Sequence, residues 1–163
     1  MEQNQLNELL ARVIRDIRAV GIPVSPNIDP EVAVNRRART RFGCCRREGD
    51  RYRIELSAAV LAAEEEKICR VLAHEVLHTC RGCANHGERW KSYSRRLNEV
   101  YGWGIRRADS FEGLGVEDER KVRYWVVCTA CGKKIPRMKR SPLVDHPERY
   151  RCRCGGTLRV EKA

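Results

Sequence analysis

The 163-residue sequence has no long hydrophobic run, no internal repeat and no low-complexity tract. No apolar stretch approaches the roughly 18 residues that a membrane-spanning helix needs. The first five residues are polar, unlike a secretory leader. We therefore expect a soluble, cytoplasmic protein without membrane association. In such a chain an odd number of cysteines, here nine, indicates reduced thiols and metal ligands rather than a disulfide framework.

The length and the apolar pattern predict one modest domain and a small second module. An amphipathic helix is predicted by apolar residues spaced three and four apart, at positions 6, 9, 10, 13, 14 and 17. Extended segments are predicted at Val32 and Val34, and at the alternating positions 52, 54 and 56, which follow a turn at 48–50. The predicted fold class is α+β, with helices packed on a small antiparallel sheet, and residues 106–118 are expected to be a linker.

The most informative motif is His74-Glu75-Val76-Leu77-His78. Residues 64–79 contain no Gly or Pro and carry an apolar face, so the motif is expected on a helix. Two histidines four residues apart project from one helix face and can bind one zinc ion. Glu75 lies beside them, where it can accept a proton from the water that attacks a substrate carbonyl. The motif therefore predicts a zinc-dependent hydrolase with Glu75 as its general base.

The third ligand has two candidates. Gly82 can adopt a positive φ and return the chain towards the first two histidines, which favours His86. Glu99, on the helix that follows, is the alternative. We prefer His86 because it directly precedes the apolar stripe that holds this later helix in place. An oxyanion-stabilising residue is also expected, with Arg89, Tyr93 and Tyr101 as candidates.

The segment Phe42 to Arg46 is a candidate substrate-binding edge, because a sheet edge beside a metal can bind an extended peptide. An ordinary hairpin is an equally good interpretation. The role of Cys80 and Cys83 is also open, since they could form a regulatory disulfide, join Cys44 and Cys45 in a metal site, or pack as small apolar residues.

Two cysteine pairs near the C-terminus have the pattern of a zinc ribbon: Cys128 with Cys131, and Cys152 with Cys154. Strand-like segments at 124–127 and 157–160 adjoin them, and zinc supplies folding free energy that a module of about 40 residues lacks. The second pair is Cys-x-Cys rather than Cys-x-x-Cys. His146 is therefore an alternative fourth ligand.

Positive charge is concentrated in the same module. Residues 119–163 hold 13 Lys and Arg against four Asp and Glu, whereas the whole chain has a net charge of +11. Such a surface favours sequence-independent binding of DNA, although a solvated face or a protein-docking surface would look the same. A second basic surface is expected on the hairpin, between residues 36 and 53. The candidate phosphate-binding residues are Lys133, Lys134, Arg137, Lys139, Arg140, Arg151 and Arg153.

The chain resembles the SprT-like family of zinc metalloproteases, especially its short bacterial members. The resemblance rests on the segment 39–44, on the string from His78 to Trp90, on the predicted helix and strand, and on the cysteine-rich module. It implies a protease domain at 1–112 and a zinc ribbon at 119–163, with one catalytic and one structural zinc. The implied catalytic ligands are His74, His78 and His86, and the implied general base is Glu75.

Eukaryotic members of the family degrade proteins crosslinked to DNA, so the resemblance implies DNA-associated protein substrates. A monomer is expected. The alternative function is a nucleic-acid-binding protein without protease activity, in which the zinc helix is only structural. Glu75 argues against that alternative, because a residue that is not a ligand has no structural need to be acidic.

Overall fold

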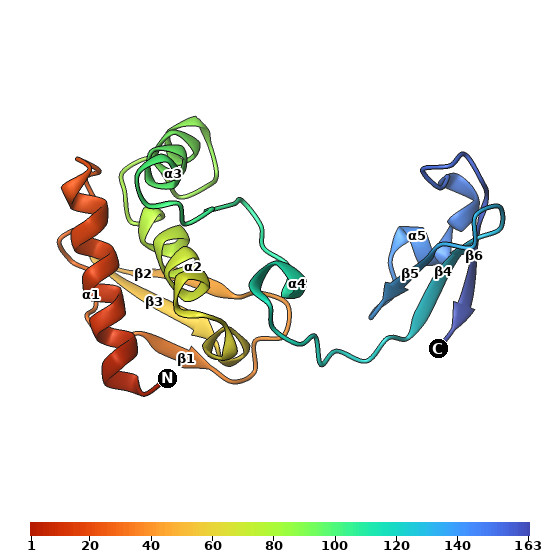
Figure 1. The fold of residues 1–163 in the computed structure, drawn as a ribbon, viewed down its shortest axis with the longest axis horizontal. Helices are drawn as coiled ribbons and strands as arrows, with labels where there is room; N and C mark the ends of the chain where they lie inside the picture. The colour runs from red at the N-terminus through yellow and green to blue at the C-terminus, as the bar shows by residue number, and fades with distance from the viewer. The chain divides into compact units, whose positions relative to one another are not determined.

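The computed structural model describes all 163 residues (Figure 1). The chain forms two compact units, Met1–Glu117 and Asp118–Ala163. The first unit contains α1 (Gln3–Ala19), β1 (Ala33–Asn35), β2 (Gly43–Glu48), β3 (Arg51–Ser57), η1 (Ala58–Ala62), α2 (Glu65–Leu77), α3 (Glu88–Tyr101) and α4 (Phe111–Leu114). The second contains β4 (Tyr124–Cys128), β5 (Lys134–Arg137), α5 (Pro142–Asp145), η2 (Pro147–Arg149) and β6 (Leu158–Lys162).

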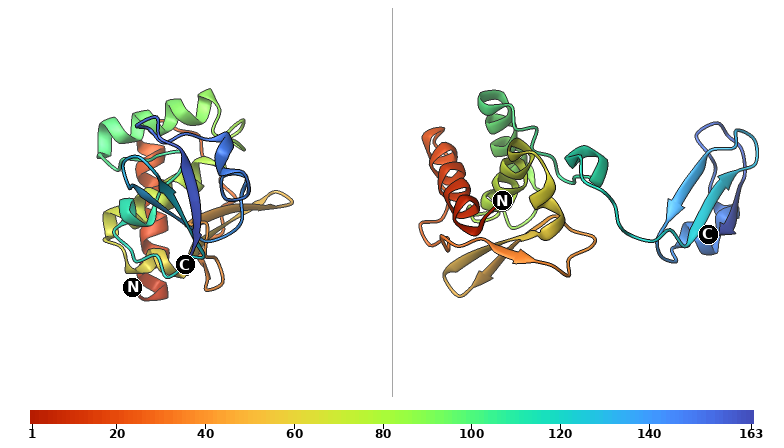
Figure 2. Two further views of the ribbon diagram at one scale, coloured as in Figure 1. Left: turned by 90° about the vertical axis from the view of Figure 1, so that its right-hand side faces the viewer. Right: turned by 60° about the horizontal axis from the view of Figure 1, so that its bottom comes forward.

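The predicted α+β class is confirmed, and the helices α1 and α2 lie on one face of the first sheet (Figure 2). Helix α1 begins with a capping box between Glu2 and Gln5, which satisfies backbone N–H groups at its first turn. Its apolar stripe is buried against α2, as the spacing predicts. Most of the fully buried side chains of this core come from α1, β3, α2 and α3, and include Leu6, Leu10, Ile17, Ile54, Leu56, Ile68, Leu72, Trp90 and Leu97.

The first sheet has the strand order β1-β3-β2. The hairpin of β2 and β3 is antiparallel and turns at Gly49, where φ is +65°. Strand β1 runs parallel to β3, so the expectation of a wholly antiparallel sheet is wrong for this pair. The reason is the connection 36–42, which crosses the end of β3. Ser57 fastens it there, with its N–H donating to Phe42 O and its hydroxyl donating to Ala38 O.

The segment expected to be a linker, residues 106–118, belongs largely to the first unit. Leu114 is fully buried and Val116 is 9% exposed, and both join the main core. The short helix α4 is capped by Ser110, whose hydroxyl accepts a hydrogen bond from Gly113 N. The glycines and charged residues around Leu114 and Val116 mask these two core positions in the sequence. In the structure the first unit extends to Glu117.

The second unit is a three-stranded antiparallel sheet with the order β5-β4-β6. The central strand places Val126 opposite Ile135 on one side and Val160 on the other. Val126 is fully buried, and Val127, Cys128 and Val144 of α5 are also buried. The strands expected around the cysteine pairs are present.

No helix in the structure has the length and apolar character that crossing a bilayer requires.

Two shortened chains test whether residues 111–117 complete the first core. A chain ending at Glu117 should retain the stability of the first unit, whereas a chain ending at Ser110 should lose roughly 2–5 kcal/mol, because burial of a Leu or Val side chain contributes about 1.5–3 kcal/mol each. Urea unfolding followed by circular dichroism measures both. Equal unfolding midpoints would show that the segment is a linker after all.

Candidate active site and metal sites

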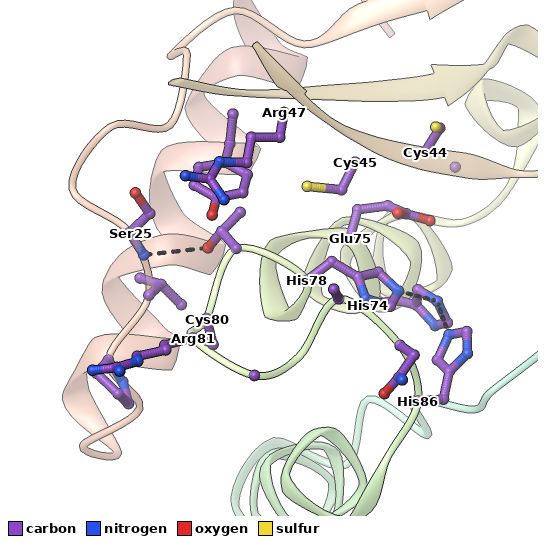
Figure 3. A pocket seen from close by; sticks show the side chains of 18 of the residues that line it. Ser25, Cys44, Cys45, Arg47, His74, Glu75, His78, Cys80, Arg81 and His86 are labelled. Carbon is purple, nitrogen blue, oxygen red and sulfur yellow. Dashed lines mark hydrogen bonds between the residues drawn. The ribbon is translucent and has the colours of Figure 1, made fainter. Parts of the chain in front are cut away.

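Three imidazole nitrogens converge at the C-terminal end of α2 (Figure 3). His74 Nε2 lies 2.9 Å from His86 Nε2 and 3.3 Å from His78 Nε2. His74 and His78 are one helical turn apart, as their spacing requires. Gly82, with φ at +78°, reverses the chain and returns His86 to the other two. The alternative ligand, Glu99, is exposed on α3 and does not belong to the cluster.

The opposite ring nitrogens are held by backbone carbonyls. His74 Nδ1 lies 2.8 Å from Arg106 O, and His78 Nδ1 lies 2.7 Å from Cys83 O. A carbonyl oxygen only accepts a hydrogen bond, so in both rings Nδ1 carries the proton and Nε2 presents a lone pair. Burial lowers the pKa of His74 to about 4, which keeps the ring neutral at physiological pH. The two Nε2 atoms are therefore held as acceptors.

Two nitrogen lone pairs at this distance repel each other unless a cation lies between them. A tetrahedral zinc ion with Zn–N bonds of about 2.1 Å would separate them by roughly 3.4 Å. The separation of 3.3 Å between His74 and His78 matches that value, whereas the 2.9 Å between His74 and His86 is shorter. Trp90 packs against all three rings, at centroid distances of 4.6–5.9 Å, and limits their movement. The histidine cluster is thus a candidate metal site that fits zinc.

Glu75 lies against strand β2. Its side chain is 7% exposed, and the backbone N–H of Cys45 donates a hydrogen bond to its carboxylate. Burial raises the pKa of Glu75 to about 7, although the Cys45 N–H opposes this shift. A Cβ atom at position 43 would lie 2.5 Å from Glu75 Oε1, closer than such contacts permit. Gly43 is therefore what allows the carboxylate to reach the strand.

Strand β2 is the free edge of its sheet and borders a groove of about 960 Å³. The two metal-site histidines of the helix and Glu75 line this groove, together with β2 and the loops 23–26 and 79–86. The expected edge at 42–46 therefore lies where an extended peptide would reach the histidine cluster. The three candidate oxyanion residues do not line the groove. Tyr101, for example, donates its hydroxyl to Asp16 O on α1.

Cys80 and Cys83 are buried, at 3% and 0% exposure, and burial raises the pKa of Cys80 to about 12. They form no metal cluster with Cys44 and Cys45. Of the interpretations left open, packing as small apolar residues fits best. The main-chain carbonyl of Cys83 nevertheless orients His78, so this turn positions a ligand through its backbone.

The second unit contains a four-sulfur cluster formed by Cys128, Cys131, Cys152 and Cys154. Cys128 Sγ lies 3.6 Å from Cys154 Sγ, and Cys131 Sγ lies 3.7 Å from Cys152 Sγ. Zn–S bonds of about 2.3 Å give a tetrahedral edge of roughly 3.8 Å, so these spacings fit zinc. The Cys-x-Cys pair supplies both of its thiols, and His146 lies outside the cluster.

The surroundings of Cys128 favour a thiolate. The backbone N–H groups of Cys131 and Ala130 donate to its sulfur and lower its pKa to about 6. Gly156 is required here, because a Cβ atom at that position would lie 2.8 Å from Cys128 Sγ. Zinc binds thiolates rather than thiols, so this environment favours metal binding near neutral pH.

The predicted phosphate-binding residues lie on the second unit. Arg140 forms an ion pair with Asp145 at 2.7 Å, whereas the other six have no carboxylate partner. Arg151 donates to the main-chain carbonyls of Glu148 and Tyr150 instead. The module therefore presents positive charge that its own acidic residues leave largely uncompensated.

Sequence reasoning missed a buried ion pair that supports the histidine site. Arg70, 9% exposed and four residues before His74, forms an ion pair with Asp109 at 3.2 Å. Its Nε also donates to Trp103 O at 2.9 Å. These contacts fix the segment on either side of Arg106, whose carbonyl holds His74. A basic residue between two apolar neighbours of the helix, Cys69 and Val71, was the only signal in the sequence.

A metal-ligand helix beside the free edge of a small sheet, with a third ligand after a short turn, is the arrangement of a zinc-metalloprotease-type domain. The model of the SprT-like family matches residues 21–112. The chain therefore belongs to the SprT-like family, and the resemblance noted in the sequence is confirmed. A comparison with curated proteins found no match to this chain.

The Arg70–Asp109 pair should control metal affinity through His74. Asp109→Asn should weaken zinc binding by roughly 10- to 100-fold, the usual effect of losing a group that orients a ligand. Competition with a chromophoric chelator measures the affinity. Glu65→Gln is the matched control, because it removes the exposed ion pair of Arg12 with α2. If Asp109→Asn lowered thermal stability but left zinc affinity intact, the ion pair would have only a structural role.

Proposed function

We propose that this protein is a zinc-dependent endopeptidase that cleaves protein substrates. The observation that carries the proposal is the convergence of three histidine nitrogens beside a buried glutamate that is not part of their cluster. A zinc ion held by His74, His78 and His86 would supply Lewis-acid chemistry to the scissile carbonyl and to the attacking water. The other steps fall to the residues of the chain.

Glu75 is the general base in this proposal. It accepts a proton from water as the water attacks the carbonyl, and it returns the proton to the leaving amine. A carboxyl group whose burial-raised pKa lies near 7 suits both transfers, since general acid–base catalysis is most efficient near the working pH. The free edge of β2 binds the substrate backbone as an added strand and aligns the scissile bond with the histidines.

The alternative is a nucleic-acid-binding protein in which the histidine site only stabilises the fold. The burial of Glu75 favours the enzyme. A carboxylate that serves no chemistry costs free energy when it is buried against a strand, because the charged form loses its hydration. A structural zinc site would also use four protein ligands, whereas this cluster offers three and leaves one position open.

For the second unit we propose a structural zinc bound by the four cysteines and a surface that binds DNA without sequence preference. The module would bring the protease to proteins associated with DNA or crosslinked to it. Six of its proposed phosphate-binding residues have no acidic partner, which leaves them available to a phosphate backbone. We propose that the protein acts as a cytoplasmic monomer.

Replacing the general base tests the enzyme. Glu75→Gln should retain its bound zinc but lose roughly 100-fold or more of its proteolytic rate, because the amide cannot accept the proton. Zinc content by plasma emission spectrometry and cleavage of an unfolded protein such as casein measure the two effects. His86→Ala, in contrast, should lose both the metal and the activity. Equal rates for the wild type and Glu75→Gln would rule out the catalytic assignment.

Removing the second unit tests the DNA surface. A chain ending at Glu117 should keep basal proteolysis but bind DNA much more weakly, and the full chain should lose affinity with salt at a log–log slope of about 0.7–0.9 per phosphate neutralised. Fluorescence anisotropy at two salt concentrations measures both, with single- and double-stranded DNA. The matched control replaces Lys133, Lys134, Lys139 and Arg153 by Gln, which leaves the zinc cluster in place. Equal affinities for all three proteins would assign the module to protein docking.

A further inference from the structure

The groove beside the histidine cluster carries two arginines at one end, Arg47 and Arg81 (Figure 3). Arg47 comes from β2 and Arg81 from the turn after α2. Glu75 is the only carboxylate that lines the groove, and it lies at the end near the histidines. The end away from the metal site is therefore positively charged.

Neither arginine is neutralised by the protein. Arg47 donates from Nε to Gly49 O and lies over the ring of Tyr52, 5.8 Å from its centroid, while Arg81 is exposed and forms no ion pair. Two other arginines of the same hairpin region differ in this respect. Arg41 and Arg46 both pair with Glu55, at 2.6 and 3.5 Å. Of the two arginines on β2, the one without an ion pair, Arg47, is thus the one that lines the groove.

The strand sets the distance between this charge and the reacting bond. Gly43, Cys45 and Arg47 alternate along β2 and share one face, because successive side chains of a strand point to opposite sides. Gly43 and Cys45 contact Glu75, and Arg47 follows Gly43 by four residues, or about 13 Å along the strand. A peptide extended along the edge of β2 has the same rise per residue.

We propose that the groove selects substrates with an acidic side chain two to four residues from the bond that is cut, on one side of that bond only. Arg47 and Arg81 are the specificity-determining residues. This inference rests on the proposed endopeptidase function and deepens it. A peptide is the favoured occupant because the arginines are in register with a free strand edge, and an extended peptide repeats that spacing whereas a nucleic-acid backbone does not.

Binding to the inactive protein tests the preference without requiring catalysis. Zinc-loaded Glu75→Gln is titrated into pairs of fluorescent peptides that differ only in having Asp or Asn two to four residues from the bond that would be cut. One set of pairs varies the residues before that bond, and a second set varies the residues after it. The Asp peptide should bind about 3- to 10-fold more tightly, as expected for ion pairs at partly exposed arginines, and the difference should shrink with salt. The combined Arg47→Gln and Arg81→Gln change should abolish the difference. Arg53→Gln, on an exposed position of β3 outside the groove, should preserve it.

The outcomes separate this inference from the proposed function. Equal affinity for the two peptides, or no measurable binding of either, overturns the inference. Cleavage of both peptides at equal rates by the wild type overturns it as well, while the protease assignment stands. Tighter binding of the Asp peptide, without cleavage of either peptide by the wild type, supports the acidic preference and contradicts the protease assignment. Single-stranded DNA that competes only when Arg47 and Arg81 are present would assign the arginines to nucleic acid.

Discussion

Mutual repulsion of imidazole lone pairs is the constraint on which the histidine site of the first unit depends. Lone pairs that face one another at this distance repel, so the protein must hold the three rings in place. Two backbone carbonyls fix the outer nitrogens of His74 and His78, and Trp90 packs against all three rings. The fold therefore restricts the three rings, which reduces the entropy that binding a metal would otherwise cost.

The same site contains a second energetically unfavourable feature, the buried carboxyl group of Glu75. A backbone N–H from β2 and, more weakly, the positive charge of Arg41 offset the burial of Glu75. The strand that donates this hydrogen bond is also the free edge of the sheet that borders the groove, so the helix and the sheet edge meet at the carboxyl group. Burying a carboxyl group lowers the stability of the fold, and such burial is common at functional sites that depend on a shifted pKa.

The sequence predicted those features that arise from periodicity and ligand chemistry. The apolar stripe of α1, the zinc helix and the four sulfurs all follow from residue type and spacing, and His86 follows from a glycine that can reverse the chain. The direction of β1 was not predictable, because it depends on a connection that crosses the end of β3. The carbonyls of Arg106 and Cys83 were equally hidden, because any residue type offers the same main-chain oxygen. Leu114 and Val116 were misassigned because two apolar residues among glycines and charged residues show neither helical nor strand periodicity.

Gly43 shows how a residue without a side chain can govern the chemistry of another. Alanine scanning infers the role of a residue from what is lost when its side chain is truncated, and at glycine there is nothing to truncate. The information at this position lies in excluded volume: a single methyl group would occupy the space that the carboxylate of Glu75 fills. A search for function that looks only at reactive groups would pass over it. The size of the largest residue tolerated at position 43 is therefore a direct measure of how closely the strand and the carboxyl group must approach.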